Sequence, residues 1–244
     1  MNITPLQKLR STDPSLGTWL SSGSATVSEL AARCGLDWLL LDMEHGCLSE
    51  AELLSNLRAI NGHPVATVVR VPTHEAGLIA RVLDWGADAI MVPHVESATE
   101  AEALVRAMRY SPEGDRGFSR SVRAYGYGLE SPEGQPKPML FAQIESVRGV
   151  ENVEAIAGVV GVDVLFVGPA DLRLSLSTHP GAPSYEEALD LIIESAKTNA
   201  TLTGILVRDR KDTEPLIKQG FTKIAVDSDM SILRSGFLSI RGER

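Results

Sequence analysis

The 244-residue sequence predicts an α/β protein that folds as a single (β/α)8 TIM barrel. Short apolar runs alternate eight times with segments whose apolar residues recur at helical spacing. The apolar runs are continuous, as in Asp37–Asp42, which indicates strands that are buried on both faces of a parallel sheet. We therefore expect one barrel domain over residues 1–244, a length typical of this fold.

The elements follow from these patterns in order. Strands are expected at 17–21, 37–42, 64–71, 88–93, 139–144, 163–168, 202–206 and 222–226. Helices are expected at 24–33, 49–60, around 78–83, at 97–109, 149–157, 185–198 and 214–219, with a last helix from about residue 230. Ser49 followed by Glu52 forms a capping-box pattern that marks one helix start. The eighth strand–helix unit is the least clearly indicated by the sequence, because its short strand also fits the edge of an open sheet.

Composition narrows the classes of function. The formal net charge of −9 and the absence of a clustered Lys/Arg stripe argue against nucleic-acid binding. No run of about 18 apolar residues occurs, so we expect no membrane-spanning helix, and the polar first residues do not resemble a signal peptide. Two cysteines, Cys34 and Cys47, are too few for a disulfide framework, which favours a reducing cytoplasm.

Two carboxylates are expected to meet at one edge of the barrel. Residues 139–171 indicate strand, helix and strand, a parallel βαβ unit, and Glu145 and Asp171 follow its two strands. Two such negative charges repel each other unless a cation lies between them or one is protonated. A divalent cation with oxygen ligands fits this pair. The alternative is that each carboxylate only caps the helix that follows it.

Other polar side chains also follow strand ends, where barrel enzymes place catalytic groups. Arg70 could hold a carboxylate or stabilise a developing enolate oxygen, or it could serve as a structural partner for an acidic neighbour. His45 is preceded by Asp42, a pair suited to general-base work. Residues 168–171 open a helix whose backbone N–H groups suit an anion such as a carboxylate.

Two other chemistries do not fit. No P-loop or dinucleotide-binding glycine pattern follows a strand. A Schiff-base aldolase needs a lysine in the barrel mouth, whereas the lysines of this chain fall in predicted helices, loops or strand starts. These exclusions favour metal-dependent enolate chemistry.

Several motifs resemble, in order and spacing, those of the HpcH/HpaI aldolase family of metal-dependent pyruvate aldolases. They are LLLDMEHG, VVRVP, LDWGADAIMVPHVESATEA, RYSPEGDRG, AQIES followed by GV and N, and VLFVGPADL, and the resemblance runs from about residue 17 to 229. It implies a barrel with an exchanged eighth helix, assembled as a hexamer (a trimer of dimers). It also implies reversible cleavage of a 4-hydroxy-2-oxo acid into pyruvate and an aldehyde, with Mg²⁺, Mn²⁺ or Co²⁺ as cofactor.

The resemblance further implies roles for individual residues in the pyruvate half of the site. Glu145 and Asp171 would be the metal ligands. Arg70 would contact the keto or enolate oxygen of pyruvate, with Gln143 beside it. The helix start at Gly168, Pro169, Ala170 and Asp171 would receive the pyruvate carboxylate through the amides of its last two residues.

The aldehyde half is assigned fewer residues by the resemblance. His45, supported by Asp42, would handle protons or the aldehyde oxygen, and Trp19 would line the site. A CoA-ester lyase or another enolate-forming enzyme of the superfamily is the alternative activity, although no segment is suited to hold a CoA tail. A non-catalytic barrel that binds a 2-oxo acid is the alternative class, which the full set of polar strand-end residues disfavours.

Three arginines depart from the family pattern. Arg120 and Arg123, with Tyr125, give residues 116–128 a cationic and aromatic character, and Arg208 follows the seventh strand where many relatives have small or apolar residues. We expect all three to lie at the barrel mouth with the metal site and to favour an aldehyde that carries a carboxylate or phosphate. The alternative is that they form ion pairs across a subunit contact.

Overall fold

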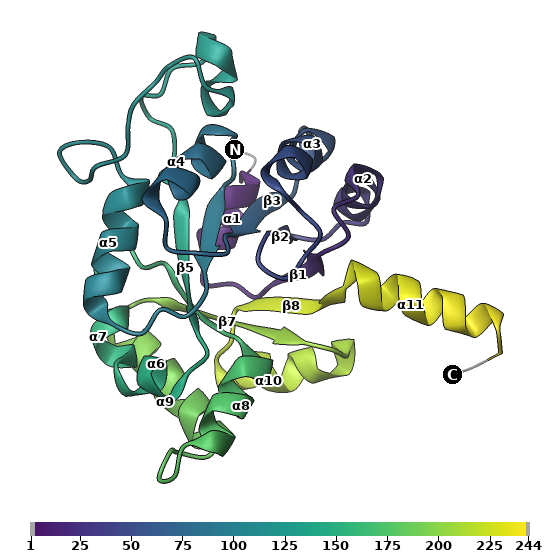
Figure 1. Cartoon of the computed structure of the whole chain (residues 1–244), viewed down its shortest axis with the longest axis vertical. Helices are drawn as coiled ribbons and strands as arrows, with labels where there is room; N and C mark the ends of the chain where they lie inside the picture. Colours follow the sequence, from purple (N-terminus) through teal and green to yellow (C-terminus); the bar gives the residue numbers. More distant parts are fainter. Residues whose placement is uncertain (1–2, 243–244) are drawn as a thin grey trace.

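The computed structural model describes residues 3–242 and shows a closed barrel of eight parallel strands (Figure 1). Each strand pairs with the next along the chain, and the last pairs with the first. The strands are β1 (Ser15–Leu20), β2 (Trp38–Asp42), β3 (Ala66–Arg70), β4 (Ala89–Val92), β5 (Met139–Ile144), β6 (Val164–Val167), β7 (Leu202–Val207) and β8 (Lys223–Ser228). The predicted fold class is confirmed, and β8 closes the barrel instead of forming the edge of an open sheet.

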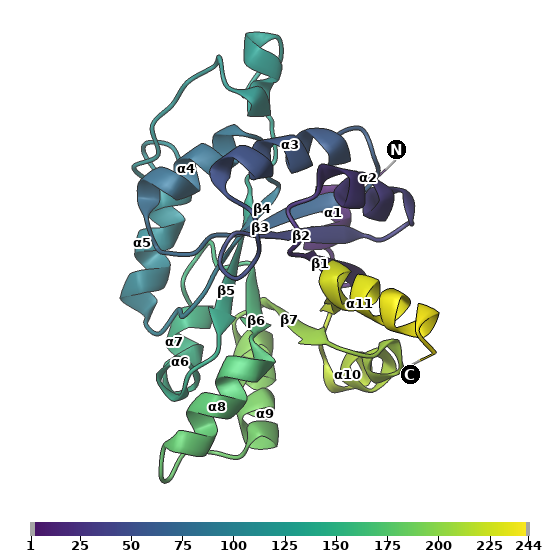
Figure 2. The same cartoon turned by 45° about the vertical axis from the view of Figure 1, so that its right-hand side comes forward.

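Helices surround the barrel (Figure 2). They are α1 (Pro5–Arg10), α2 (Ala25–Arg33), α3 (Glu50–Ile60), α4 (Ala76–Asp84), α5 (Ala98–Met108), α6 (Val147–Glu151), α7 (Val153–Ala157), α8 (Pro169–Thr178), α9 (Tyr185–Thr198), α10 (Thr213–Gln219) and α11 (Asp229–Ile240), with 3-10 turns η1 (Arg123–Gly128) and η2 (Arg210–Asp212). The helix expected at 149–157 is two short helices that meet at Asn152, whose side-chain amide donates to the carbonyl oxygens of Arg148 and Glu96. No helix in residues 3–242 combines the length and apolar character needed to cross a membrane.

Helix α1 was not expected from the sequence, and it closes the N-terminal end of the barrel. Thr4 and Gln7 form a capping box and Pro5 occupies the first turn, so the start signals were present in the sequence. Leu6 and Leu9 are buried and join the cluster of apolar side chains inside the barrel. Their burial seals this end of the barrel from solvent.

Large aromatic rings fill the barrel interior. Trp38, Phe141 and Phe166 are fully buried, and their ring centroids lie 6.2–6.4 Å apart. Two glycines make room for them, because a Cβ at Gly17 would lie 2.3 Å from the Trp38 ring and a Cβ at Gly204 would lie 2.4 Å from the Phe166 ring. The packed interior leaves no room for a ligand between these rings, and catalytic groups of this fold gather beyond them, at the C-terminal ends of the strands, the barrel mouth.

Lys223 lies at the opposite end from the mouth. It begins β8, is fully buried, and its Nζ donates to the carbonyl oxygens of Ser11 and Asp13 at 2.8 and 2.9 Å. Burial lowers the pKa of Lys223 to about 8. A low pKa is a property of imine-forming lysines, but this amine is held beneath the aromatic layer, which agrees with the exclusion of Schiff-base chemistry.

The prediction that Arg120 and Arg123 lie at the mouth is wrong. Their segment follows helix α5 and precedes β5, and loops that run from a helix to a strand lie at the N-terminal face of a barrel. Arg123 confirms this placement, because its guanidinium donates to the carbonyl oxygens of Leu57 near the end of α3 and Trp85 just after α4. The segment extends away from the barrel beyond α4 (Figure 1).

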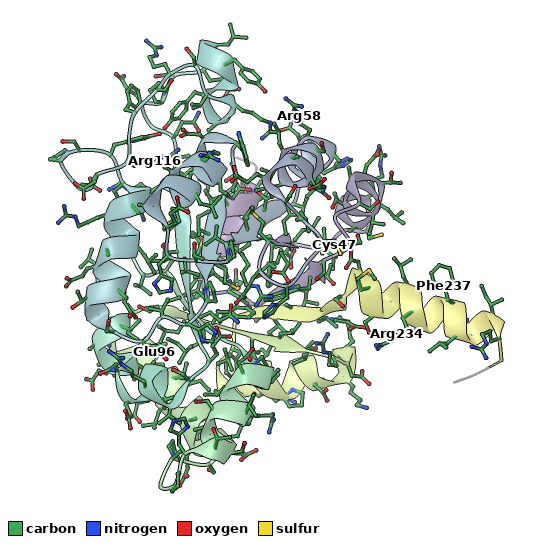
Figure 3. All side chains as sticks on the ribbon, in the orientation of Figure 1. Cys47, Arg58, Glu96, Arg116, Arg234 and Phe237 are labelled. Carbon is green, nitrogen blue, oxygen red and sulfur yellow. The ribbon has the colours of Figure 1, made fainter. Side chains whose placement is uncertain are left out.

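Helix α11 protrudes from the barrel and packs little of its length against it (Figure 1). Phe237 projects from one side of this helix and Arg234 from the other (Figure 3). Five large apolar side chains of the helix are exposed: Met230, Ile232, Leu233, Phe237 and Ile240.

Candidate active site

A cavity of about 430 Å³ opens at the barrel mouth. Nine of the residues expected at the site line it, namely Trp19, Asp42, His45, Arg70, Gln143, Gly168, Pro169, Ala170 and Asp171. The tenth, Glu145, is buried beside the cavity and accepts a hydrogen bond from Gln143. The structure thus brings together residues from the ends of four strands, β1, β2, β3 and β5, and from the start of α8.

Strand periodicity explains why these side chains face the cavity. Val68 and Phe141 pack inside the barrel with the interior cluster. Because side chains alternate between the two faces of a strand, Arg70 and Gln143, two residues further on, point to the same side. They lie beyond the aromatic layer, where the interior opens to the mouth.

Asp42 and Trp19 fix the position of Arg70. The guanidinium donates to both carboxylate oxygens of Asp42, at 2.9 and 2.8 Å, and lies 4.9 Å from the Trp19 ring centroid. Trp19 Nε1 also donates to Asp42 at 3.1 Å. Burial alone would raise the pKa of Asp42, but the hydrogen bonds and charge of Arg70 outweigh burial and lower it. Asp42 is therefore held as a carboxylate.

The expected support of the His45 ring by Asp42 does not occur. Both Asp42 oxygens are occupied by Arg70 and Trp19, and Oδ1 also accepts from the backbone N–H groups of Glu44 and His45 at 3.1 and 3.4 Å. The His45 side chain is 68% exposed, and its Nε2 lies 3.8 Å from Glu44 Oε1. Asp42 therefore shapes the turn that carries His45, while Glu44 is the acidic neighbour of its ring.

Glu44 also contributes directly to the site, which the sequence reasoning missed. Its Oε2 lies 2.8 Å from Arg70 Nη1, so the guanidinium is flanked by two carboxylates. The signal in the sequence was the alternation Asp42–Met43–Glu44, which continues the inward-facing positions of β2 past its end.

Glu145 is a buried carboxylate with polar neighbours on two sides. It accepts from Gln143 Nε2 at 2.5 Å and from the backbone N–H of His94 at 2.9 Å, and His94 Nδ1 lies 3.4 Å away. Burial raises the pKa of Glu145, and the nearby charges of Asp171 and Glu44 raise it further. The sequence placed His94 at the end of the fourth strand without a role, because its left-handed backbone (φ 50°) after β4 is what brings its N–H to Glu145.

The donor set fits a divalent cation. Glu145 and Asp171 supply carboxylate oxygens, and the buried Oε1 of Gln143 has no hydrogen-bond partner within the described chain. Gly168 leaves room for them, since a Cβ there would lie 2.2 Å from Glu145 Oε2. In residues 3–242 no three His, Cys, Asp or Glu side chains converge as ligands.

The start of α8 offers backbone donors to an anion. Gly168 is its N-cap and provides no side-chain cap, and Pro169 has no N–H. The N–H groups of Ala170 and Asp171 are the first available donors of this helix, and both residues line the cavity. A carboxylate at this helix terminus would gain hydrogen bonds and the favourable helix dipole.

Of the three unusual arginines, Arg208 is the one that lines this cavity. It follows β7, its side chain is 69% exposed, and its Nη1 lies 3.7 Å from Asp227 Oδ1. Arg173 on α8 also lines the cavity, and its guanidinium lies 3.4 Å from the centroid of the Tyr185 ring.

A fixed guanidinium and a helix terminus beside paired carboxylates suit an enzyme that develops negative charge on a 2-oxo acid. The protein is accordingly a carbon–carbon lyase on a (β/α)8 barrel. It belongs to the HpcH/HpaI aldolase/citrate lyase family, whose model matches residues 15–235. The family resemblance seen in the motifs is thus confirmed.

Individual relatives agree with this assignment. The chain is 42% identical over 235 residues to a hydroxypyruvate/pyruvate aldolase of Paraburkholderia phytofirmans, covering 91% of this chain and 90% of the relative. It is 39% identical over 226 residues to a 5-keto-4-deoxy-D-glucarate aldolase of Klebsiella pneumoniae, covering 90% and 88%. A crystal structure of a family protein from Burkholderia cenocepacia superposes with a TM-score of 0.89 at 37% identity, covering 97% of both chains.

Proposed function

We propose that this protein is a class II aldolase that reversibly cleaves a 4-hydroxy-2-oxo acid into pyruvate and an aldehyde. The observation that carries the proposal is Arg70, which Asp42 and Glu44 hold next to the carboxylate pair Glu145 and Asp171. The names of the two curated relatives, both aldolases, support the same reaction class.

Glu145 and Asp171 are the proposed ligands of a divalent cation, Mg²⁺, Mn²⁺ or Co²⁺. When bound, the cation supplies Lewis-acid polarisation of the keto oxygen. Their position at neighbouring strand ends supports this role, as does the raised pKa of Glu145, because a cation would offset the repulsion between the charges.

Pyruvate is held by three parts of the chain. The amides of Ala170 and Asp171 bind its carboxylate at the start of α8. Arg70 donates to the keto oxygen and stabilises the negative charge that this oxygen gains as the enolate forms. Gln143 lies beside Arg70 on the pyruvate side of the cavity, and its amide donates to the carboxylate of Glu145 and keeps that side chain in position.

His45, at the barrel mouth, accepts the proton that the aldehyde half gives up in cleavage. In cleavage, His45 accepts the proton of the 4-hydroxyl, the C3–C4 bond breaks, and its electron pair passes into the enolate of pyruvate. The exposed ring of His45 can exchange that proton with water, and Trp19 forms an apolar wall of the cavity. Water at the mouth supplies a proton to C3 of the enolate, which completes pyruvate, and His45 returns to water the proton that it accepted.

We also propose that the chain works as one barrel domain in a cytoplasmic homohexamer, a trimer of dimers. The exposed apolar residues of α11 support assembly, since a helix exchanged with a second copy would cover them. The free cysteines Cys34 and Cys47 are both exposed, which suits a reducing compartment. Light scattering after gel filtration measures the molar mass of the assembly, and the mass of a monomer would contradict the proposed hexamer.

The function is tested by pyruvate release from a 4-hydroxy-2-oxo acid. Enzyme treated with a chelator should release no pyruvate, and Mn²⁺ should restore release. Turnover at the full rate in the stripped enzyme would contradict the class II mechanism. Activity on a CoA ester alone would indicate the CoA-ester lyase, and 2-oxo-acid binding without turnover would indicate a non-catalytic barrel.

A further inference from the structure

We infer that Arg208 selects the aldehyde, and that the preferred aldehyde carries a negative charge at the end remote from its carbonyl group. The inference rests on the proposed aldolase function and names the substrate class for the second half of the same site. The charge can be a carboxylate or a phosphate, since a guanidinium binds both.

The side of β7 that faces the interior leads directly to Arg208. Leu206 packs against the interior cluster, and Arg208 lies two residues further along the strand direction. Both residues line the active-site cavity. Because side chains alternate between the two faces of a strand, Arg208 points to the same side as Leu206, toward the mouth and not toward the surrounding helices.

Arg208 also marks where the cavity continues outward. Together with Ser228 it lines both the active-site cavity and a neighbouring hollow, which is otherwise formed by Asp227, Met230, Ser231 and Arg234. Ala170 and Asp171 line the active-site cavity but not the neighbouring hollow, and Glu145 lies beside the active-site cavity. Arg208 is thus placed for the part of a substrate that extends beyond pyruvate.

The charge balance leaves Arg208 available to a ligand. Arg70 has two carboxylates in contact, Asp42 and Glu44, so its charge is compensated. Arg208 has a long contact of 3.7 Å with Asp227, whose Oδ1 has no hydrogen-bond partner within the described residues. The N–H donors of Arg208 are therefore not satisfied by that carboxylate.

The size of the effect follows from the exposure of Arg208. A charge-assisted hydrogen bond can favour a ligand by roughly tenfold to a hundredfold. Solvent weakens contacts to exposed charges, so we expect a preference of about tenfold in kcat/KM for the anionic aldehyde. The preference should also shrink as salt rises to about 0.5 M, because salt screens exposed charges.

The experiment compares matched aldehydes in the condensation direction with pyruvate and Mn²⁺. Succinic semialdehyde is compared with butanal, and glyceraldehyde 3-phosphate with glyceraldehyde, so the two arms distinguish a carboxylate from a phosphate. The variant Arg208→Gln should lose about tenfold more kcat/KM with the anionic aldehyde than with the neutral one, chiefly through KM. Asp227→Asn should strengthen the preference, because it removes the competing carboxylate and asparagine tolerates the positive φ of 55° at this position.

Arg148 provides a closely matched control. It also follows a strand end, its side chain is 65% exposed, and its guanidinium lies 3.7 Å from a single carboxylate, that of Glu96. Glu96 lies across the barrel from Arg234 (Figure 3), and Arg148 does not line the cavity. Arg148→Gln should keep the full preference for anionic aldehydes.

Two results would overturn the inference. One is equal kcat/KM for charged and neutral aldehydes in the wild type, in both arms and at low salt. The other is a preference that survives Arg208→Gln, with the variant folded as shown by circular dichroism. A wild type that condenses no aldehyde and does not exchange the methyl protons of pyruvate overturns the aldolase proposal itself, and this inference with it.

Discussion

Asp42 holds Arg70 through two parallel hydrogen bonds, from Nε to Oδ1 at 2.9 Å and from Nη2 to Oδ2 at 2.8 Å. A planar guanidinium forms this fork, whereas an ammonium group cannot. Nη1 lies 2.8 Å from Glu44 Oε2 in an ion pair, so a second carboxylate also holds the guanidinium. The orientation of Arg70 in the cavity is thus set before any ligand binds.

Arg70→Lys should slow exchange of the methyl protons of pyruvate by about 10²-fold or more, the loss typical for one oxyanion donor. Lysine keeps the charge but loses the fork to Asp42 and the correct direction of the donor. Exchange is followed by proton NMR in D₂O with Mn²⁺ removed before detection. Exchange at the wild-type rate in a folded variant would exclude Arg70 from the mechanism.

Glu145→Gln should abolish stoichiometric Mn²⁺ binding and pyruvate release while leaving the barrel folded. The amide preserves the shape of the side chain but removes the charge that a cation needs. Calorimetric titration with Mn²⁺ measures binding directly. The matched control is Glu151→Gln, an exposed glutamate on α6, which should bind Mn²⁺ as the wild type does; tight binding by the Glu145 variant would contradict the ligand assignment.

Gly168→Ala should lower kcat by about 10²-fold with a normal circular dichroism spectrum. The added Cβ would lie 2.2 Å from Glu145 Oε2 and 2.7 Å from Gln143 Nε2, so both side chains must move. A displacement of about 1 Å at a reacting centre has an effect of this size. Gly77→Ala on α4 is the control, because its Cβ would meet only Glu75 Oε1 at an ordinary 3.5 Å; equal activity of the two variants would show that Gly168 is not needed for close packing.

Lys223→Met should change how stability depends on pH. Burial lowers the pKa of Lys223 to about 8, below the value of about 10.4 in an unfolded chain. Between these values the unfolded chain binds a proton that the folded chain has released, so this group makes the free energy of unfolding rise with pH. The difference in unfolding free energy, wild type minus variant, should therefore increase from pH 8 to pH 10.

Urea denaturation at pH 7, 8, 9 and 10 measures this difference, and titrations of other groups cancel in it. Lys218→Met is the control, since Lys218 is exposed and pairs with Glu214 on the helix surface. A difference that stays constant with pH in the Lys223 variant would show that the amine has an ordinary pKa.

The barrel was predictable because its strands are continuous apolar runs followed by polar residues. That rule found Arg70 and Glu145, whose positions depend only on where a strand ends. The same rule placed His94 at the end of the fourth strand but gave it no role, because its contact with Glu145 comes from a left-handed backbone that sequence periodicity does not reveal. Arg123 was misplaced for a different reason: the direction of the connection, from helix to strand, determines the barrel face, and the cationic character of the segment does not.

The closed N-terminal end of the barrel affects the order in which substrates bind and products leave. With Leu6 and Leu9 closing one end and the aromatic layer above them, substrates and products share a single entrance. Under the proposed function pyruvate lies deeper, against Arg70, and the aldehyde lies nearer the entrance, beside Arg208. The shared entrance fixes the order of binding and release. In cleavage the aldehyde leaves before pyruvate, and in condensation pyruvate binds before the aldehyde.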